Sequence, residues 1–164
     1  MRRAADAPVL QTTVAPEWID YNSHMNDAAY ARVFSLACDA LMDAIGLDDS
    51  TRRASGRTIY TLQVMLHYFH EAKLGEAIAV SARVLERDAK RLRIWMEMTR
   101  ASDGERLAAS EQLLLSVDSS GPSPRAAAWS DAVAGALERM AAEGEGIDAP
   151  PEAGRGITLR RGKG

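Results

Sequence analysis

The sequence predicts a single α+β domain in which one long helix covers an antiparallel β-sheet. Residues 26–46 repeat apolar side chains at helical spacing, and residues 58–117 contain four successive runs with the alternation of strands. The chain of 164 residues is 46% hydrophobic and 26% charged, which suits one globular domain with a sizeable core. An antiparallel sheet needs its apolar face covered, and the amphipathic helix supplies that cover.

The first elements are a short strand and the long helix. Residues 9–14, which lie between two prolines, form the predicted strand. The helix has Asn26 as its N-cap, Asp27 at the positive end of its dipole and Gly46 at its end. The polar residues 48–56 are read as a loop. The predicted buried face of the helix consists of Tyr30, Val33, Phe34, Ala37, Leu41, Ala44 and Ile45.

The remaining strands are predicted to form a meander. They span residues 58–70, 78–84, 92–98 and 107–117, with turns at 71–75, 88–90 and 102–104. The first of them carries an apolar face along its whole length, because every second residue is apolar. This face consists of Tyr60, Leu62, Val64, Leu66 and Tyr68.

A second helix is predicted over residues 129–142, with Ser130 at its cap, and it is expected to pack on an edge of the sheet. We divide the chain into an N-terminal tail (1–8), a single domain (9–143) and a flexible basic tail (144–164). One interpretation is that this tail is solvated. The alternative is that Arg155 or its neighbours contact the phosphates of a nucleotide-like cofactor. The basic residues of the tail are Arg155, Arg160, Arg161 and Lys163.

Composition excludes several classes of function. A formal net charge of −3 argues against a general nucleic-acid-binding protein. No apolar run is long enough to span a bilayer and the first residues lack the apolar stretch of a signal peptide, so we expect a cytoplasmic protein. The single cysteine excludes an internal disulfide and a cysteine-based zinc site, and the three histidines lack the spacing of metal ligands.

That cysteine, Cys38, is a possible nucleophile, since His24 and Asn22 would complete a Cys/His/Asn set. However, four helical turns separate it from the histidine, about 20 Å at the rise of an α-helix. We therefore interpret Cys38 as a small buried hydrophobic residue.

Potential acid, base and capping groups are concentrated just before the long helix, where Asp20, Asn22, His24, Asn26 and Asp27 fall within eight residues. The first N–H groups of a helix suit an anion or a developing oxyanion. The alternative is that the acidic and amide residues only form the turn and the cap, and that the histidine is structural.

This stretch, DYNSHMNDAAY, resembles the hotdog-fold acyl-thioester enzymes of the 4-hydroxybenzoyl-CoA thioesterase-like superfamily. Their pattern is Asp or Asn, then G/S-H-[VM]-N-[ND]-x-x-Y at the start of the helix, followed by a β-meander. The resemblance covers residues 9–118. It implies a hotdog fold, in which two protomers join their sheets into a homodimer or a dimer of dimers with the active site between them.

Three further strings, PEWIDYNSHMNDAAY, GRTIYTLQ and DAKRL, are similar to the thioesterases associated with carnitine dehydrogenase. This similarity implies hydrolysis of a short acyl-CoA, with betainyl-CoA as the substrate. Coenzyme A then enters as part of the substrate, and we expect no other cofactor and no metal.

The resemblance also points to particular residues. In the plant acyl-ACP thioesterases, which share the fold, an Asp-x-Asn-x-His set and a glutamate after the following strand are implicated in catalysis. Asp20, Asn22 and His24 match the set, and Glu71 stands where the glutamate is expected. The bacterial 4-hydroxybenzoyl-CoA enzymes use the first acid of an Asp-x-Asp motif, a position occupied here by Trp18, so their aspartyl nucleophile does not carry over.

A thiol has a pKa of about 8.5 and departs easily, so one carboxylate and an oxyanion hole suffice for thioester hydrolysis. We expect Asp20, oriented by Asn22, to act as general base or nucleophile, with His24 positioning the thioester or the water. Glu71 is the rival base, which the partner chain could supply, and its alternative is a surface turn residue. The backbone N–H groups expected to bind the oxyanion belong to Met25, Asn26 and Asp27.

Two sets of side chains are candidates for substrate binding. Basic residues around the predicted hairpin could meet the phosphates of CoA, with a solvated edge as the alternative: Arg87, Lys90, Arg91 and Arg93. Aromatic residues could line the acyl pocket and hold a trimethylammonium group, with core packing as the alternative: Trp18, Tyr30, Tyr60, Tyr68 and Trp95.

Two other functions stay open at this point. One is a hydratase or dehydratase acting on acyl-CoA, in which His24 and a carboxylate relay a proton. The other is a non-catalytic hotdog module that binds acyl-CoA.

Overall fold

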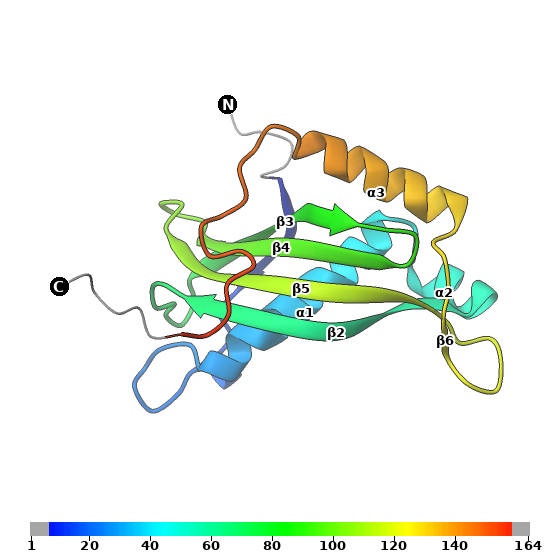
Figure 1. Ribbon diagram of the computed structural model, residues 1–164. Coiled ribbons are helices and arrows are strands. Elements are labelled where there is room, and N and C mark those ends of the chain that lie inside the picture. Colours follow the sequence, from blue (N-terminus) through cyan, green and yellow to red (C-terminus); the bar gives the residue numbers. More distant parts are fainter. Residues whose placement is uncertain (1–6, 159–164) are drawn as a thin grey trace.

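The computed structural model of the protein describes residues 7–158 and confirms the α+β architecture (Figure 1). Its helices are η2 (Pro16–Trp18, a 3₁₀ turn), α1 (Asp27–Ala44), α2 (Asp49–Ser55) and α3 (Asp131–Glu143). Its strands are β1 (Pro8–Thr13), β2 (Arg57–Tyr68), β3 (Ala77–Arg87), β4 (Arg91–Arg100), β5 (Arg106–Asp118) and β6 (Arg125–Ala126). The short β6 was not predicted.

The strands form one antiparallel sheet in the order β1-β3-β4-β5-β2, and β6 pairs with the end of β5. The predicted meander is therefore only partly correct: β3, β4 and β5 are consecutive neighbours, but β2 pairs with β5 at the far edge. Residues 69–76 are consequently a crossover from one side of the sheet to the other and not a hairpin turn. Alternation identifies a strand but does not specify its partner, which explains the error.

Helix α1 covers one face of the sheet, as predicted. The side chain of Asn26 accepts a hydrogen bond from the Ala28 N–H at 2.8 Å, and Gly46 follows the helix with φ +89°, so both predicted ends are confirmed. The buried side chains of α1 are Ala29, Tyr30, Val33, Phe34, Ala37, Cys38, Leu41 and Met42. They share one core with Ile78, Val80, Leu92, Ile94, Met96, Met98 and Leu114 of the sheet.

The predicted loop at residues 48–56 is wrong, because it contains helix α2. Asp48 caps this helix by accepting from the Thr51 N–H at 2.8 Å, and Gly56 ends it in the left-handed conformation with φ +66°. Arg53 pairs with Asp49 at 2.9 Å across one turn. No residue of α2 is buried, so the helix has no apolar periodicity that could have predicted it.

The predicted apolar face of β2 is also wrong, because the strand contains a bulge. The pairing with β5 shifts register between Thr61 and Gln63, which leaves Leu62 as the extra residue. Val64, Leu66 and Tyr68 therefore face α1 as predicted, whereas Tyr60 lies opposite Leu115 on the other face. A one-residue shift reverses the alternation of every residue before it.

Helix α3 begins as predicted, with the Ser130 side chain accepting from the Val133 N–H at 3.4 Å. Its buried residues Val133 and Leu137 join the main core, and α3 packs beside β3 (Figure 1). The Trp129 indole N–H donates to the Asp88 carbonyl at 3.0 Å and fixes the approach to the helix. Within residues 7–158 no helix is long and apolar enough to cross a membrane.

Residues 145–158, here called the C-terminal strap, lie across the face of the sheet opposite α1 (Figure 1, red). Glu152 accepts two hydrogen bonds from Arg106, at 3.1 and 3.2 Å, and the Gly154 N–H donates to Glu111 at 2.8 Å. This part of the predicted flexible tail is thus attached to the sheet. The side chain of Arg155 is exposed. Arg160, Arg161 and Lys163 lie outside the described residues.

Candidate active site

The polar residues before α1 form a closed loop. Ile19 and Met25 pair as an isolated antiparallel bridge, and the Asp20 N–H donates to the His24 carbonyl at 2.9 Å. The Asp20 carboxylate accepts from the Asn22 N–H at 2.8 Å, and Ser23 adopts a left-handed conformation with φ +64°. The Asp20 carboxylate is thus engaged within its own loop.

His24 meets Glu71 within one chain. The distance from His24 Nε2 to Glu71 Oε2 is 2.9 Å, and the side chains are 32% and 65% exposed, respectively. Glu71 is carried by the crossover 69–76, which is tied to the loop by the Met25 N–H donating to the Ala72 carbonyl at 2.8 Å. Of the four predicted catalytic residues, His24 and Glu71 are thus in contact. A histidine and a carboxylate in contact and open to solvent form an arrangement that can accept and return a proton.

Of the three backbone groups expected to bind an oxyanion, two are already used. The Met25 N–H donates to Ala72, and the Asn26 N–H donates to the Trp18 carbonyl at 2.8 Å. Within residues 7–158, the Asp27 N–H alone of the three has no acceptor. It lies in the first turn of an 18-residue helix, where the helix dipole favours negative charge.

The predicted aromatic residues separate into two groups. Tyr30 and Tyr68 pack edge to face at the start of α1, with ring centroids 5.3 Å apart, and Trp18 lies in the preceding turn. Tyr30 is only 4% exposed, whereas Tyr68 is 51% exposed. Tyr60 lies about 26 Å from Tyr68 along β2 at the usual rise of a strand. Trp95 is buried on the face of β4 away from α1, beside His67.

The predicted basic hairpin lies at the other end of the sheet, where β4 begins. Arg91 lies opposite Leu115 on β5 and Tyr68 lies opposite Ala108, so about 23 Å of strand separates them. Carboxylates accompany the arginines: Arg91 pairs with Asp88 at 2.6 Å, Arg93 with Glu86 at 2.9 Å and Glu111 at 2.6 Å, and Arg87 with Glu138 at 3.5 Å. Lys90 is exposed and forms no ion pair with the residues that the structure describes.

Hydrogen bonds explain the electrostatics of this hairpin. The backbone N–H of Lys90 and the side chain of Arg91 lower the pKa of Asp88 to about 2. The hydrogen bonds that Arg93 donates to Glu86 and Glu111 raise the pKa of its guanidinium. Both groups therefore stay charged across the physiological range, and the hairpin is close to electrically balanced.

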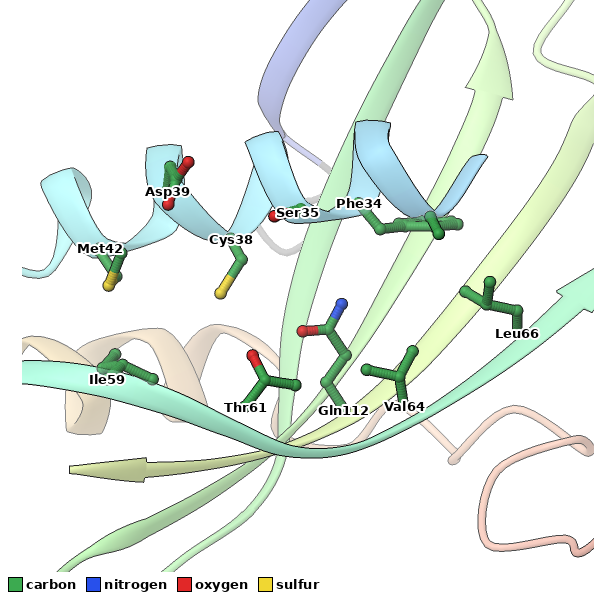
Figure 2. Close-up of a pocket in the computed structure, with 11 residues that line it drawn as sticks. Phe34, Ser35, Cys38, Asp39, Met42, Ile59, Thr61, Val64, Leu66 and Gln112 are labelled. Carbon is green, nitrogen blue, oxygen red and sulfur yellow. The ribbon is translucent and has the colours of Figure 1, made fainter. Parts of the chain in front are cut away.

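A pocket of about 470 Å³ opens between α1 and β2 (Figure 2). In Figure 2 the side chains of Phe34, Cys38 and Met42 descend from α1 toward β2 and β5. Along α1 the pocket begins at Ala31, the residue after Tyr30, and along β2 it reaches Leu66, two residues before Tyr68. The strand residues that line it are Ile59, Thr61, Val64, Leu66 and Gln112.

Two features of this pocket bear on its chemistry. Burial raises the pKa of the Cys38 thiol to about 11, so the thiol is neutral and a poor nucleophile, as its position in the sequence suggested. Gln112 is a lining residue that the sequence analysis missed, and its side-chain N–H donates to the buried Ser110 hydroxyl at 3.1 Å. Ser110 and Gln112 occupy positions of β5 that face α1 and lie between apolar residues. A polar residue at such a position is a sequence signal that could have identified them.

Within residues 7–158, no group of three or more His, Cys, Asp or Glu side chains is arranged to hold a metal ion.

Comparison with known proteins agrees with the fold and the motif. Residues 14–137 match the Thioesterase-like superfamily. The betainyl-CoA thioesterase of Pseudomonas aeruginosa is 42% identical over 149 residues, which cover 91% of this chain and 92% of that protein. The L-carnitine dehydrogenase/betainyl-CoA thioesterase of Rhizobium meliloti is 34% identical over 154 residues, which cover 93% of this chain but only 30% of that longer protein.

A solved structure is similar over nearly the whole chain. It is a Staphylococcus aureus protein in complex with CoA, with a TM-score of 0.85, 25% identity and coverage of 92% of this chain and 94% of that one. The hotdog architecture and the resemblance carried by DYNSHMNDAAY are thereby confirmed. The chain belongs to the thioesterase-like superfamily.

Proposed function

We propose that this protein hydrolyses betainyl-CoA to betaine and CoA, with the His24–Glu71 pair activating the attacking water. Membership of the thioesterase-like superfamily and 42% identity to a betainyl-CoA thioesterase support the reaction. The contact of 2.9 Å between His24 Nε2 and Glu71 Oε2, at the solvent-exposed start of α1, carries the assignment of the site. CoA is part of the substrate, and no step of the proposed mechanism uses a cofactor.

Glu71 takes the role of general base in preference to Asp20. The Asp20 carboxylate is engaged by the Asn22 N–H inside its own loop, whereas the Glu71 carboxylate is exposed and contacts the imidazole. Glu71 removes a proton from water while the His24 N–H holds the carboxylate in place. General-base catalysis of this kind contributes about 10²–10⁴-fold to a rate.

The water oxygen attacks the thioester carbonyl carbon and gives a tetrahedral intermediate, whose oxyanion accepts the Asp27 N–H at the start of α1. The intermediate collapses with cleavage of the C–S bond. CoA leaves as the thiolate, and the proton held by Glu71 returns to the sulfur or to solvent. The carboxylic acid formed then loses its proton to solvent, so the products are the carboxylate and CoA.

The trimethylammonium group of the substrate is proposed to lie against Tyr68, a half-exposed ring whose hydroxyl donates to the Asp27 carbonyl at 3.2 Å, with Trp18 on the other side. Each good cation–π contact is worth about 0.5–2 kcal/mol. The pocket between α1 and β2 lies directly beyond Tyr68 and gives the acyl group room. Tyr60 and Trp95 have no part in this proposal.

For the CoA moiety, Lys90 is the proposed phosphate ligand of the hairpin, because it is exposed and has no carboxylate partner among residues 7–158. Arg91 and Arg93 would each have to exchange a carboxylate for a phosphate. Because CoA esters are intracellular metabolites, a cytoplasmic location is part of the proposal.

A homodimer is also part of the proposal. In the described part of the chain, β2 is an edge strand with one unpaired side, and its exposed residues include Tyr60, Leu62, Val64 and Tyr68. A long apolar edge invites pairing with another strand. Antiparallel pairing of β2 with its copy would continue the sheet and close the open side of the pocket.

The test of the reaction follows CoA release with a thiol-reactive dye; the buried, neutral Cys38 contributes little to this signal. The substrates are betainyl-CoA, its uncharged isostere 3,3-dimethylbutyryl-CoA, medium straight-chain acyl-CoAs and an aromatic acyl-CoA. We expect kcat/KM for betainyl-CoA to exceed that of the isostere by about tenfold or more, since about 1.4 kcal/mol of cation–π attraction corresponds to that factor.

Equal rates with the isostere would keep the thioesterase and reject recognition of the cation. Binding of the CoA esters without release of thiol from any of them would overturn the proposed activity.

A further inference from the structure

The segment that carries Glu71 is held by hydrogen bonds to its backbone, and the Glu71 carboxylate is left to contact His24. The Phe69 and His70 N–H groups both donate to the Leu107 carbonyl, at 2.9 and 3.1 Å. Beyond Glu71, Ala72 is completely buried and its carbonyl accepts the Met25 N–H at 2.8 Å. The crossover is thus fixed on both sides of the proposed base.

A single hydroxyl bridges the two neighbours of Glu71. The Ala72 N–H donates to the Tyr30 hydroxyl at 3.0 Å, and the same hydroxyl donates to the His70 carbonyl over a longer distance of 3.4 Å. Tyr30 stands in the first turn of α1, six residues after His24. The helix that begins at the His24 loop therefore also holds the backbone on either side of Glu71.

Burial keeps the Tyr30 hydroxyl suited to this bridge. Tyr30 is 4% exposed, and burial, together with the nearby carboxylates of Glu71 and Glu76, raises its pKa. The hydroxyl therefore stays neutral at physiological pH and can donate and accept at once. A ring this deeply buried offers little surface to a ligand, so contact with substrate does not account for the residue.

Arg100 of β4 also forms a hydrogen bond with the backbone of this segment. Its Nη2 donates to the Glu71 carbonyl at 3.1 Å. The guanidinium is itself held between Asp103, at 3.0 Å, and Glu76, at 3.2 Å. Three consecutive residues, 70–72, are thus each bonded through the backbone to Tyr30 or Arg100.

From this geometry we infer that Tyr30 is a positioning residue for catalysis: its hydroxyl, assisted by Arg100, fixes the crossover so that the Glu71 carboxylate stays against His24. The inference rests on the proposed function, in which Glu71 is the base. A displacement of about 1 Å in a catalytic group costs about 10²-fold in rate, so loss of the bridge would impair turnover without removing a group that touches substrate.

The test compares Tyr30→Phe, which removes only the hydroxyl, with Tyr21→Phe, which makes the same change at a tyrosine 95% exposed in the adjacent loop. We expect Tyr30→Phe to lower kcat by about 10- to 100-fold with KM changed less than about threefold, and to alter the pH profile of kcat. Tyr21→Phe should keep kcat within about twofold of the unmodified protein.

A double variant separates positioning from general damage. In a Glu71→Gln background, Tyr30→Phe should cause no further loss, because there is no base left to position. An equal loss in both backgrounds, or an unchanged kcat in Tyr30→Phe, would overturn the inference. Full activity of Glu71→Gln alone would instead overturn the proposed base.

If Tyr30→Phe does not fold, Arg100→Gln tests the same segment from the other side. It removes the bond to the Glu71 carbonyl, and we expect kcat to fall with little change in KM. An unchanged kcat in this variant would overturn the inference.

Discussion

The imidazole of His24 lies 2.9 Å from the carboxylate of Glu71, although His24 precedes α1 and Glu71 follows β2. The contact forms inside one chain because the crossover from β2 to β3 passes the loop that begins α1, where Met25 and Ala72 are hydrogen bonded. A meander with β2 next to β3 would have needed only a tight turn at this point. The strand order therefore creates the candidate site.

Replacement of Glu71 by glutamine should lower kcat by about 10²–10⁴-fold, because the amide cannot accept the proton of water. KM should change little, since the side chain keeps its size and can still contact His24. Steady-state thiol release from betainyl-CoA measures both constants.

Glu105→Gln is the matched control, because Glu105 also pairs with a histidine at 2.9 Å, His70, on an exposed turn. Its kcat should be unchanged. A Glu71→Gln variant as active as this control would remove Glu71 from the mechanism.

Asp20 should behave as a structural residue of its loop. Asp20→Asn keeps an acceptor oxygen for the Asn22 N–H and should keep most of kcat, whereas Asp20→Ala should lower the free energy of unfolding by about 1 kcal/mol. Urea unfolding and thiol release measure the two effects. A loss of about 10²-fold or more in kcat for both variants, with stability unchanged, would identify Asp20 as the base instead.

Most of the fold follows from local sequence signals, and the exceptions have physical causes. Asn26, Gly46 and Ser130 mark helix ends through their own hydrogen bonding and conformation, so their roles could be predicted from the residues alone. The bulge at Leu62 and the partner of β2 depend on pairing between distant segments, which alternation does not encode. Helix α2 has no buried face and so carries no apolar period.

The candidate site was predictable as a set of residues more than as a geometry. The resemblance predicted His24 and Glu71, and the structure brings them together. The structure places Asp20 in a turn. It also separates Tyr60 and Trp95 from the other rings, because the bulge and the sheet face determine where those two side chains lie. The bridging role of Tyr30 was not predictable, since it depends on the path of the crossover.

Cys38 should resist modification while the protein is folded. Its pKa of about 11, raised from 9.0 by burial, leaves almost no thiolate at pH 8, so a thiol reagent should label it only after unfolding. Because the folded pKa is the higher one, this thiol stabilises the fold below pH 9, and that contribution is lost as the pH rises from 9 to 11.

The difference between the two pKa values corresponds to about 2–3 kcal/mol. Urea unfolding at pH 8 and pH 11 should show a steeper loss of stability for the unmodified protein than for Cys38→Ala. Parallel losses in the two proteins would contradict the assignment.

The edge of β2 should control association. We expect the unmodified protein to have twice the 17.8 kDa mass of one chain in light scattering after gel filtration. Leu62→Lys, at the exposed bulge, should shift it toward the monomer, because an edge lysine opposes strand pairing. Leu74→Lys makes the same change at an exposed site next to β1, at the opposite edge of the sheet, and should leave the mass unchanged. A monomeric unmodified protein would reject the proposed dimer.

The C-terminal strap should be released when Glu152 loses its charge. Hydrogen bonds from Arg106 lower the pKa of Glu152 below its ordinary value of 4.5. Because the folded pKa is the lower one, the attachment is complete above pH 4.5 and is lost as the pH falls through the folded value. Glu152→Gln should therefore reduce the hydrogen-exchange protection of the Gly154 amide already at pH 7. Glu145→Gln, at an exposed position of the same strap, should not, and equal protection in the two variants would show that the Arg106–Glu152 pair does not hold the strap.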